Sequence, residues 1–308
     1  MFESLVINWL QEASIKAVAR QQLRLSWNAI DGAMQRAVKR GLARRERQTP
    51  THLCVDETSF HKGHDYVTVV TDPDRAHVLH VLDDHTKARL ESFYDGLDEA
   101  QKSAIESVSM DMLRAYINTT LAAIPGTREK IAFDKFHVAK YLGDALDQVR
   151  KQEHRALLQK GNSALTGSKY HWLTHPDNMD RERWNHFKAL RESTLKTARA
   201  WGIKELIMSL WHYVSRTWAE KAWKRWLSWA LRSRLEPMKK ATATIRNHLW
   251  GIINAIVLDV HNGHAESINS RIKMIKIRSC GFRNKLRFRN AIYFHLGGLD
   301  LYPEGLEY

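Results

Sequence analysis

Three acidic residues occupy positions from which their carboxylates could form one metal site. Asp56 and Asp111 each end a short apolar run with the residue types of a buried strand, in "THLCVDE" and "IESVSMD". Glu266 lies near the start of a helical segment, "HAESINSRIKMIKIRS". Facing carboxylates repel each other unless cations lie between them, and Mg²⁺ or Mn²⁺ prefers such hard oxygen ligands. These acids therefore fit a two-ion site of the kind that performs phosphodiester chemistry.

Plainer interpretations of the same acids stay open. Asp56 could end a strand in a solvated acidic turn, and the segment after the Asn262–Gly263 turn could be a solvated amphipathic helix. On that helix Glu266, Asn269 and Lys273 fall near one face, at steps of three and four residues. Glu57 directly follows Asp56, so it should point to the opposite face of the strand. We leave Glu57 out of the metal site.

The elements that must position these acids follow from hydrophobic periodicity. Helical spacing changes to β-rich runs after Pro50, and strands then alternate with helices. We predict strands at 51–57, 66–72, 76–84, 105–111 and 129–134, and helices at 86–105, 113–124 and 135–158. The order β-β-β-α-β-α-β-α is the ribonuclease H-like topology, an α/β (α+β) fold with a mixed sheet flanked by helices. Its first and fourth strands are neighbours, which would bring Asp56 and Asp111 together.

The segment before the sheet has two helical stripes separated by a short break. Ser26 is a natural N-cap for the second helix, and Gly41 follows its basic end. Two short helices joined by a turn match the helix-turn-helix pattern, although a plain αα-hairpin has the same signature. The basic tail "KRGLARRER" and the net charge favour DNA binding. We expect DNA contacts from Ser26, Asn28, Gln35, Lys39 and Arg40 here, and from Lys273 on the helix of Glu266.

Tryptophan is concentrated between Tyr170 and Trp250, where strand signals are almost absent. The spacing favours a helical domain that uses these rings as core, with a stacking platform for unpaired bases as the alternative. Interleaved basic residues in "EKAWKRWLSWALRSR" suggest that one face also meets phosphate. We predict a helix-turn-helix segment at 1–48, the catalytic core at 49–160 and 251–308, and a helical insertion at 161–250.

Charge and cysteine content limit the class of protein. The 308 residues include 48 Lys and Arg against 34 Asp and Glu, a formal charge of +14, which favours polyanionic partners such as nucleic acid. The first residues carry acids, and the longest apolar run is broken at Asn254, so neither a signal peptide nor a membrane span is expected. Only Cys54 and Cys280 occur, which excludes a cysteine-rich zinc module. We expect a soluble, cytoplasmic, nucleoid-associated protein.

Four blocks in order resemble the ISL-three family of bacterial insertion-sequence transposases, which belong to the DDE group. They are "VDETSFHKGHDYVTVVTD", "SVSMDMLRAYI", "IAFDKFHVAKYLGDALDQVRKQE" and "NGHAESINSRIKMIKIRSCGFRN". The resemblance extends over essentially the whole chain. It implies that Asp56, Asp111 and Glu266 are the catalytic acids and hold two Mg²⁺ or Mn²⁺ ions. Asp134 is the rival to Asp111.

The resemblance also implies what the site would do. Such a protein would cut DNA at the ends of its insertion sequence and transfer the 3′-OH into target DNA. Its partners would be terminal inverted repeats, target DNA and further copies of itself. Asp134, His137 and Asn269 are candidates for supporting the metal ligands. Family members usually carry paired cysteines before the helix-turn-helix, and nothing comparable precedes Ser14. A silent DNA-binding remnant that acts as a repressor, and a structure-selective nuclease, therefore stay open as alternatives.

Overall fold

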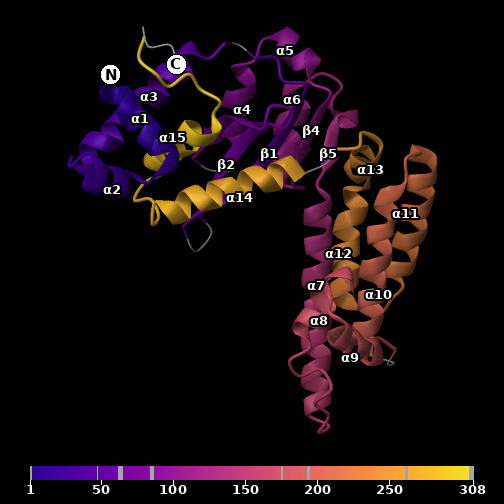
Figure 1. The fold of residues 1–308 in the computed structure, drawn as a ribbon. Coiled ribbons are helices and arrows are strands. Elements are labelled where there is room, and N and C mark those ends of the chain that lie inside the picture. The colour runs from indigo at the N-terminus through magenta and orange to yellow at the C-terminus, as the bar shows by residue number, and fades with distance from the viewer. Residues whose placement is uncertain are drawn as a thin grey trace. The chain divides into compact units, whose positions relative to one another are not determined.

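The computed structural model describes residues 2–46, 48–61, 65–83, 87–174, 176–192, 195–260 and 263–304. The chain folds into two compact units, one formed by residues 1–131 and 261–308 and the other by residues 132–260. Four strands of a five-stranded mixed sheet belong to the first unit, and the boundary between the units falls within the fifth strand. The rest of the second unit is built from helices (Figure 1). The protein is therefore a mixed α/β protein, as expected. The boundaries proposed at 48, 160 and 250 stay predictions.

The sheet has the strand order β3-β2-β1-β4-β5. Its first three strands, β1 (His52–His61), β2 (Asp65–Asp72) and β3 (His77–Leu82), are antiparallel neighbours. β4 (Ser107–Met110) pairs with β1 in parallel, and β5 (Ile131–Phe133) follows β4. The prediction that the first and fourth strands are neighbours is confirmed. β2 is almost entirely buried, which explains its near-continuous run of apolar and threonine side chains.

Helices of the first unit come from both ends of the chain. They are α1 (Phe2–Glu12), α2 (Ile15–Ala17), α3 (Trp27–Arg44), α4 (Lys87–Asp95), α5 (Glu99–Ala104), α6 (Arg114–Ala123), α14 (Gly263–Arg278) and α15 (Lys285–Leu296). A single π-helical turn, η1 (Val18–Gln22), follows α2, and a 3-10 turn, η2 (Thr127–Glu129), precedes β5. Apolar residues of α1, α3, α14 and α15 share one core with β2 and β3. The N-terminal helices are thus packed into the sheet unit, beside α15 (Figure 1).

Two of the expected helix ends differ. The helix expected at 86–105 is divided in two, because Asp98 forms a reciprocal capping box with Gln101 and starts α5. The helix predicted to end at Gly41 is α3, and it continues to Arg44. Gly41 lies against Leu299, so close that an added Cβ would be 2.7 Å from the leucine Cβ. Gly41 therefore allows α3 to pack closely against Leu299. The helix-turn-helix stays a prediction.

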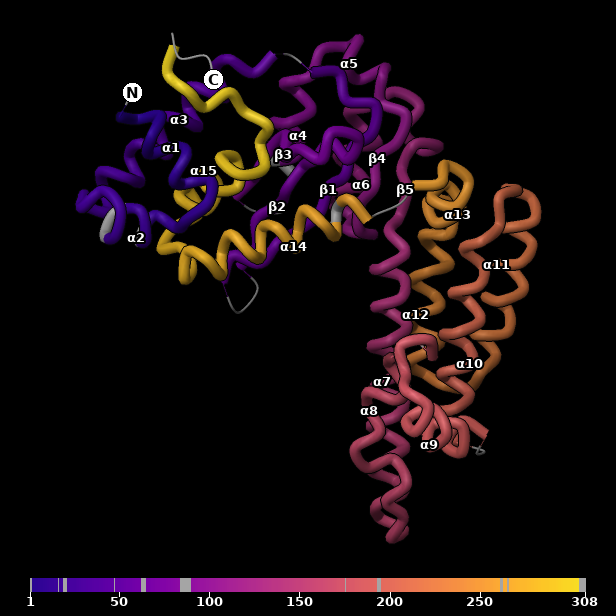
Figure 2. The backbone as a smooth tube through the Cα atoms, in the orientation of Figure 1, coloured from indigo at the N-terminus to yellow at the C-terminus, as the bar shows by residue number. Residues whose placement is uncertain are grey.

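The second unit is helical, and its tryptophans form much of its core. Its helices are α7 (Lys135–Leu158), α8 (Lys169–Leu173), α9 (Arg181–Glu192), α10 (Lys196–Ser209), α11 (Arg216–Leu231), α12 (Glu236–Asn247) and α13 (Leu249–Val257), with 3-10 turns η3 (Pro176–Asn178) and η4 (Leu210–His212). In Figure 2 these helices can be followed in chain order by colour, from magenta at the start of α7 to orange at α13. Trp172, Trp223 and Trp226 are buried, as the core interpretation predicted, whereas Trp218 is 61% exposed and Trp229 44% exposed.

Neither cysteine forms a disulfide. Cys54 is buried in β1, and Cys280 is exposed after α14. In the part of the chain that the structure describes, every helix is too short or too polar to span a lipid bilayer. Many apolar residues of the chain lie in the cores of the two units.

Candidate active site

Asp56 lies on β1, and Asp111 lies at the same level, directly after the end of the neighbouring strand β4. Val55 and Met110 are the last residues paired between β1 and β4, and each aspartate directly follows its member of that pair. Neighbouring strands lie about 4.8 Å apart, so the two aspartates are adjacent. The prediction that Asp56 ends its strand is wrong. β1 continues to His61 because it stays paired with β2. Only β4 ends here, and Asp111 begins the turn that follows.

Short hydrogen bonds hold both aspartate side chains. Asp56 Oδ1 accepts from the backbone N–H of Glu57 at 2.7 Å, and Asp111 Oδ1 accepts from the backbone N–H of Met112 at 2.6 Å. The other oxygen of Asp56, Oδ2, accepts from Asn269 Nδ2 at 2.6 Å. Asp56 is thereby fixed on two sides, by its own strand and by a helix more than two hundred residues away in sequence.

The helix α14 lies against β1 through an apolar stripe and two polar contacts. Ile268, Ile272 and Ile275 are buried at helical spacing and anchor the helix in the core. Asn269 meets Asp56, and further along the helix Lys276 Nζ donates to the backbone carbonyl of Ser59 at 3.0 Å. The helix therefore follows β1 in the same direction for two turns.

Glu266 lies in the first turn of α14, where its side chain is exposed. It precedes Asn269 by three residues, so the two share a face of the helix. Lys273 continues this face and is also exposed. Within the described ranges, however, no three His, Cys, Asp or Glu side chains are close enough together to hold a metal ion. The structure thus brings Asp56 and Asp111 together and places Glu266 one turn beyond the contact with Asp56.

The donor chemistry of this site suits a hard divalent cation. Asp56 and Asp111 offer carboxylate oxygens from adjacent strands, and Asn269 adds an amide beside them. Oxygen ligands of this kind are those that Mg²⁺ and Mn²⁺ take in proteins. Asn269, predicted as a supporting residue, does contact one of the expected ligands. Residues present here therefore fit a divalent ion, with Glu266 as the candidate third carboxylate.

Glu57 belongs to a different cluster on the opposite face of β1. Tyr116 Oη on α6 donates to Glu57 Oε1 at 3.0 Å and lies 2.7 Å from Thr68 Oγ1 on β2. Burial raises the pKa of Tyr116, so its hydroxyl keeps its proton. The prediction that Glu57 points away from Asp56 is confirmed. Tyr116 was not predicted, because nothing in its local sequence signals a partner 59 residues away.

Asp134 and His137 lie at the start of the second unit. Asp134 caps α7, with Oδ1 accepting from the backbone N–H of Phe136 at 2.7 Å. His137 Nε2 is 3.9 Å from Asp134 Oδ2. Asp134 follows β5, which β4 separates from β1 in the sheet. Strand order therefore favours Asp111 as the partner of Asp56, and the choice between the two stays a prediction.

The residues expected to bind DNA on α3 have different surroundings. Ser26 Oγ caps the helix by accepting from the Ala29 N–H at 3.2 Å, as predicted. Asn28 and Lys39 are exposed. Gln35 donates to Asp31 on its own helix at 2.8 Å. Ser26 and Gln35 thus serve the helix itself, while Asn28 and Lys39 are directed to solvent.

Arg40 is committed to structural contacts. Its guanidinium donates to the carbonyl of Leu301 at 2.7 Å and to Glu3 Oε1 at 3.1 Å. It therefore joins α1, α3 and the C-terminal segment. Its expected role in DNA binding finds no support in this geometry, because both partners hold the guanidinium inside the unit.

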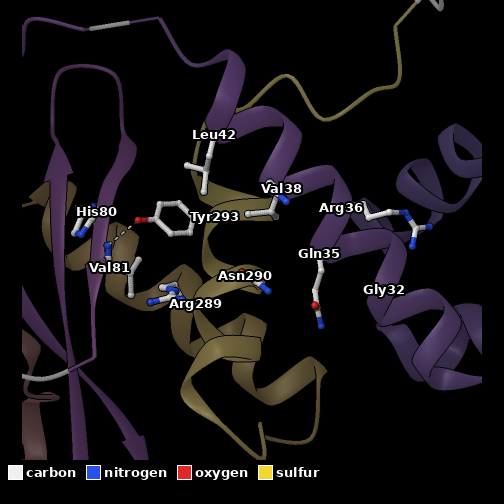
Figure 3. A pocket seen from close by; sticks show the side chains of 11 residues that line it. Gly32, Gln35, Arg36, Val38, Leu42, His80, Val81, Arg289, Asn290 and Tyr293 are labelled. Carbon is white, nitrogen blue, oxygen red and sulfur yellow. Dashed lines mark hydrogen bonds between the residues drawn. The ribbon is translucent and has the colours of Figure 1, made fainter. Parts of the chain in front are cut away.

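A cavity of about 630 Å³ lies between α3, β3 and α15 (Figure 3). Gln35 and Lys39 line it together with Arg36 and Arg289. Two of its cations already have partners: Arg36 lies 3.6 Å from Glu3, and Arg289 lies 3.6 Å from Asp83. On its inner wall Tyr293 Oη accepts from the Val81 N–H at 3.0 Å. Arg289 and the other residues that α15 adds to this basic wall were not among the predicted DNA contacts.

Comparison with known proteins identifies the family. A family model described as "Transposase", of the ISL-three type, matches residues 53–292 and so includes Asp56, Asp111 and Glu266. The transposase for insertion sequence element IS1001 of Bordetella parapertussis is 27% identical over 282 residues, 91% of this chain and 69% of the relative. The transposase for insertion sequence element IS1557 of Mycobacterium tuberculosis is 25% identical over 304 residues, 90% of this chain and 67% of the relative. The chain belongs to the ISL-three family of transposases.

Proposed function

We propose that the protein is a DDE-type transposase that cuts DNA at insertion-sequence ends and joins the freed 3′-OH to target DNA. The observation that carries the proposal is the pairing of β1 with β4, which puts Asp56 beside Asp111. Asn269 then holds α14, the helix of Glu266, against Asp56. These three acids are the proposed ligands of two Mg²⁺ or Mn²⁺ ions.

The proposed catalytic core is ribonuclease H-like. Support comes from the strand order, with three antiparallel strands followed by a fourth that is parallel to the first. The helical insertion, proposed at residues 161–250, would lie within the helical segment between β5 and α14. In this arrangement the insertion separates Glu266 from the two aspartates in sequence while the sheet unit retains all three.

The two proposed reactions are in-line displacements at phosphorus. In the first, water attacks the phosphodiester at the transposon end, and the leaving group is the 3′-oxygen of the cut strand. In the second, that 3′-OH attacks a phosphodiester of the target, whose own 3′-oxygen leaves. Bound divalent ions would neutralise charge on the phosphoryl group and activate the attacking oxygen. Asp56 and Asp111 would hold them in place, and Asn269 would keep Asp56 oriented.

DNA is the proposed partner, as terminal inverted repeats and as target. The formal charge of +14 supports a polyanionic ligand. Exposed Lys273 shares a helix with Glu266, and exposed Lys39 and Asn28 lie on α3, so each could reach a backbone phosphate. Because two ends must be joined in one event, we propose that copies of the chain assemble on DNA.

The test uses the purified chain and linear DNA carrying the sequences that flank its coding region. In Mg²⁺ or Mn²⁺ we expect cuts at the inverted repeats that leave a 3′-OH, followed by joined products when target DNA is added. In EDTA neither product should form. Binding to the repeats without cutting in either metal would indicate a silent repressor. Cutting of branched DNA without preference for the ends would indicate a structure-selective nuclease.

A further inference from the structure

A second cavity, of about 560 Å³, lies where α14 and α15 meet the segment between α1 and α2. α14 packs against α15 in the same unit as the sheet (Figure 1). Ser267, Ser270, Arg271 and Arg278 line the cavity from α14, and their spacing of three, four and seven residues places them along one side of the helix. None of the described residues that line it is an aspartate or glutamate. Apart from Gln11 and His295, the wall is made of cations, hydroxyls and apolar groups.

Two arginines of this wall have no ion-pair partner among the described residues, unlike two arginines of the neighbouring helix α15. Among the described residues, neither Arg271 nor Arg278 has a carboxylate within 4.0 Å or a hydrogen-bond acceptor for its guanidinium. By contrast, two arginines of the neighbouring helix α15 have carboxylate partners. Arg287 lies 3.2 Å from Asp31, and Arg289 lies 3.6 Å from Asp83. Two guanidiniums on one wall repel each other, and an anion between them relieves that repulsion.

His295 on α15 lies close enough to both arginines for their charges to act on its imidazole. Burial, then the charges of Arg278 and Arg271, lower the pKa of His295 to about 4. The imidazole is therefore neutral at neutral pH and can still donate one hydrogen bond. Ser267 and Ser270 add hydroxyl donors from α14. Together these groups suit an oxyanion with several acceptor oxygens, since arginine can bind two of them at once.

We propose that this cavity is a phosphate site that holds a backbone phosphodiester of bound DNA. That the phosphate belongs to DNA rests on the proposed function, and the phosphate chemistry rests on the cavity alone. Ser267 follows Glu266 and Ser270 follows Asn269, so the cavity wall and the candidate active site are adjacent faces of one helix. A phosphate held here would fix the DNA strand relative to Asp56 through a rigid element.

The test compares Arg271→Gln/Arg278→Gln with a variant of equal charge, Lys102→Gln/Lys224→Gln. Both control lysines are already paired, to Glu99 at 3.1 Å and to Glu220 at 3.3 Å. Binding of a labelled duplex to the full chain is followed by fluorescence anisotropy in EDTA over a range of salt. Each lost phosphate contact lowers the slope of log K against log salt by about 0.9. We expect the cavity variant to lose about 1 to 2 in slope and the control to lose less than half of that.

A second readout, the pKa of His295 by NMR, locates the anion. Duplex DNA bound in the cavity should raise this pKa, and Arg271→Gln/Arg278→Gln should abolish the rise. A rise with inorganic phosphate but none with duplex would mean that the site takes a free phosphate, and would overturn the assignment to DNA. Equal salt slopes for cavity variant and control, with no change at His295, would overturn the site itself. Because binding is measured without metal, a failure of the proposed cleavage activity leaves this test unaffected.

Discussion

Asn269 Nδ2 donates to Asp56 Oδ2 at 2.6 Å, which ties the helix of Glu266 to the central strand of the sheet. The two residues are 213 positions apart in sequence. This bond orients a candidate metal ligand and, with the Lys276 contact to Ser59, aligns α14 along β1. Side chains that orient a ligand in this way typically account for a 10- to 100-fold change in metal affinity or activity.

Asn269→Ala should therefore reduce metal-dependent DNA cleavage by about 10- to 100-fold. Removal of the amide takes away one of the hydrogen bonds that hold Asp56, so the metal concentration for half-maximal activity should also rise. Cleavage rates measured across a Mn²⁺ titration give both quantities. Asn247→Ala, which alters an exposed asparagine at the end of α12, is the matched control and should change neither. An unchanged Mn²⁺ dependence for Asn269→Ala would contradict this role.

Tyr116→Phe should affect stability and leave the metal dependence of cleavage unchanged. The variant removes the hydroxyl that joins Glu57 and Thr68 on the face of β1 away from Asp56. Loss of these buried hydrogen bonds should lower the free energy of unfolding by about 1–3 kcal/mol. Urea unfolding measures this loss, and cleavage rates across a Mg²⁺ titration measure the metal dependence. A shift in the metal requirement would mean that the Glu57 cluster takes part in the site.

Lys39 and Arg40 are neighbours on α3 and should behave differently when changed. Arg40→Gln breaks the contacts to Glu3 and to the Leu301 carbonyl, so we expect a loss of about 1–3 kcal/mol in unfolding free energy. Lys39→Gln removes an exposed cation and should weaken duplex binding, with a salt slope lower by about 0.9. Anisotropy and urea unfolding on both variants separate the two roles. A larger loss of salt slope in Arg40→Gln than in Lys39→Gln would reverse them.

His295 should make the first unit less stable in mild acid. Its pKa is about 4 in the folded protein, against 6.5 for an ordinary histidine, so the folded state binds fewer protons between these values. The unfolding free energy should then fall as pH decreases from about 6.5 to about 4, by about 3 kcal/mol in total. The comparison is with His295→Gln, which should lose that part of the decline. Identical pH profiles for both proteins would show that the histidine titrates normally.

Local signals in the sequence predicted most of the elements that form this site. Ser26 caps a helix as predicted, and the strands near Asp56 and Asp111 are found where the sequence has β-rich runs. The length of β1 was not predictable in the same way. It extends beyond Asp56 because β2 pairs with it as far as His61, and such pairing depends on the partner strand.

Long-range contacts were the part that the sequence could not provide. The acceptor of Arg40 is a backbone carbonyl at Leu301, and a carbonyl has no signature in a sequence. The contact of Asn269 with Asp56 required two separate facts, the face of α14 and its direction along β1. Helical spacing in the sequence predicts which face of α14 carries Asn269. The direction of α14 along β1 is seen only in the folded chain. The arginine-lined cavity likewise depends on how α14 meets α15.

Asp56 contacts α14 through Asn269, whereas its strand neighbour Glu57 contacts Tyr116, so Glu57 serves as the matched control for Asp56. We would measure cleavage of DNA carrying the insertion-sequence ends in Mg²⁺ for Asp56→Asn and for Glu57→Gln. Loss of a metal ligand removes several kcal/mol of charge stabilisation, so Asp56→Asn should be slower by at least about 100-fold. Glu57→Gln, whose partner is Tyr116, should keep a rate within about 3-fold of the original after correction for folded protein. Cleavage by Asp56→Asn at the original rate would show that Asp56 is not a ligand of the catalytic metal.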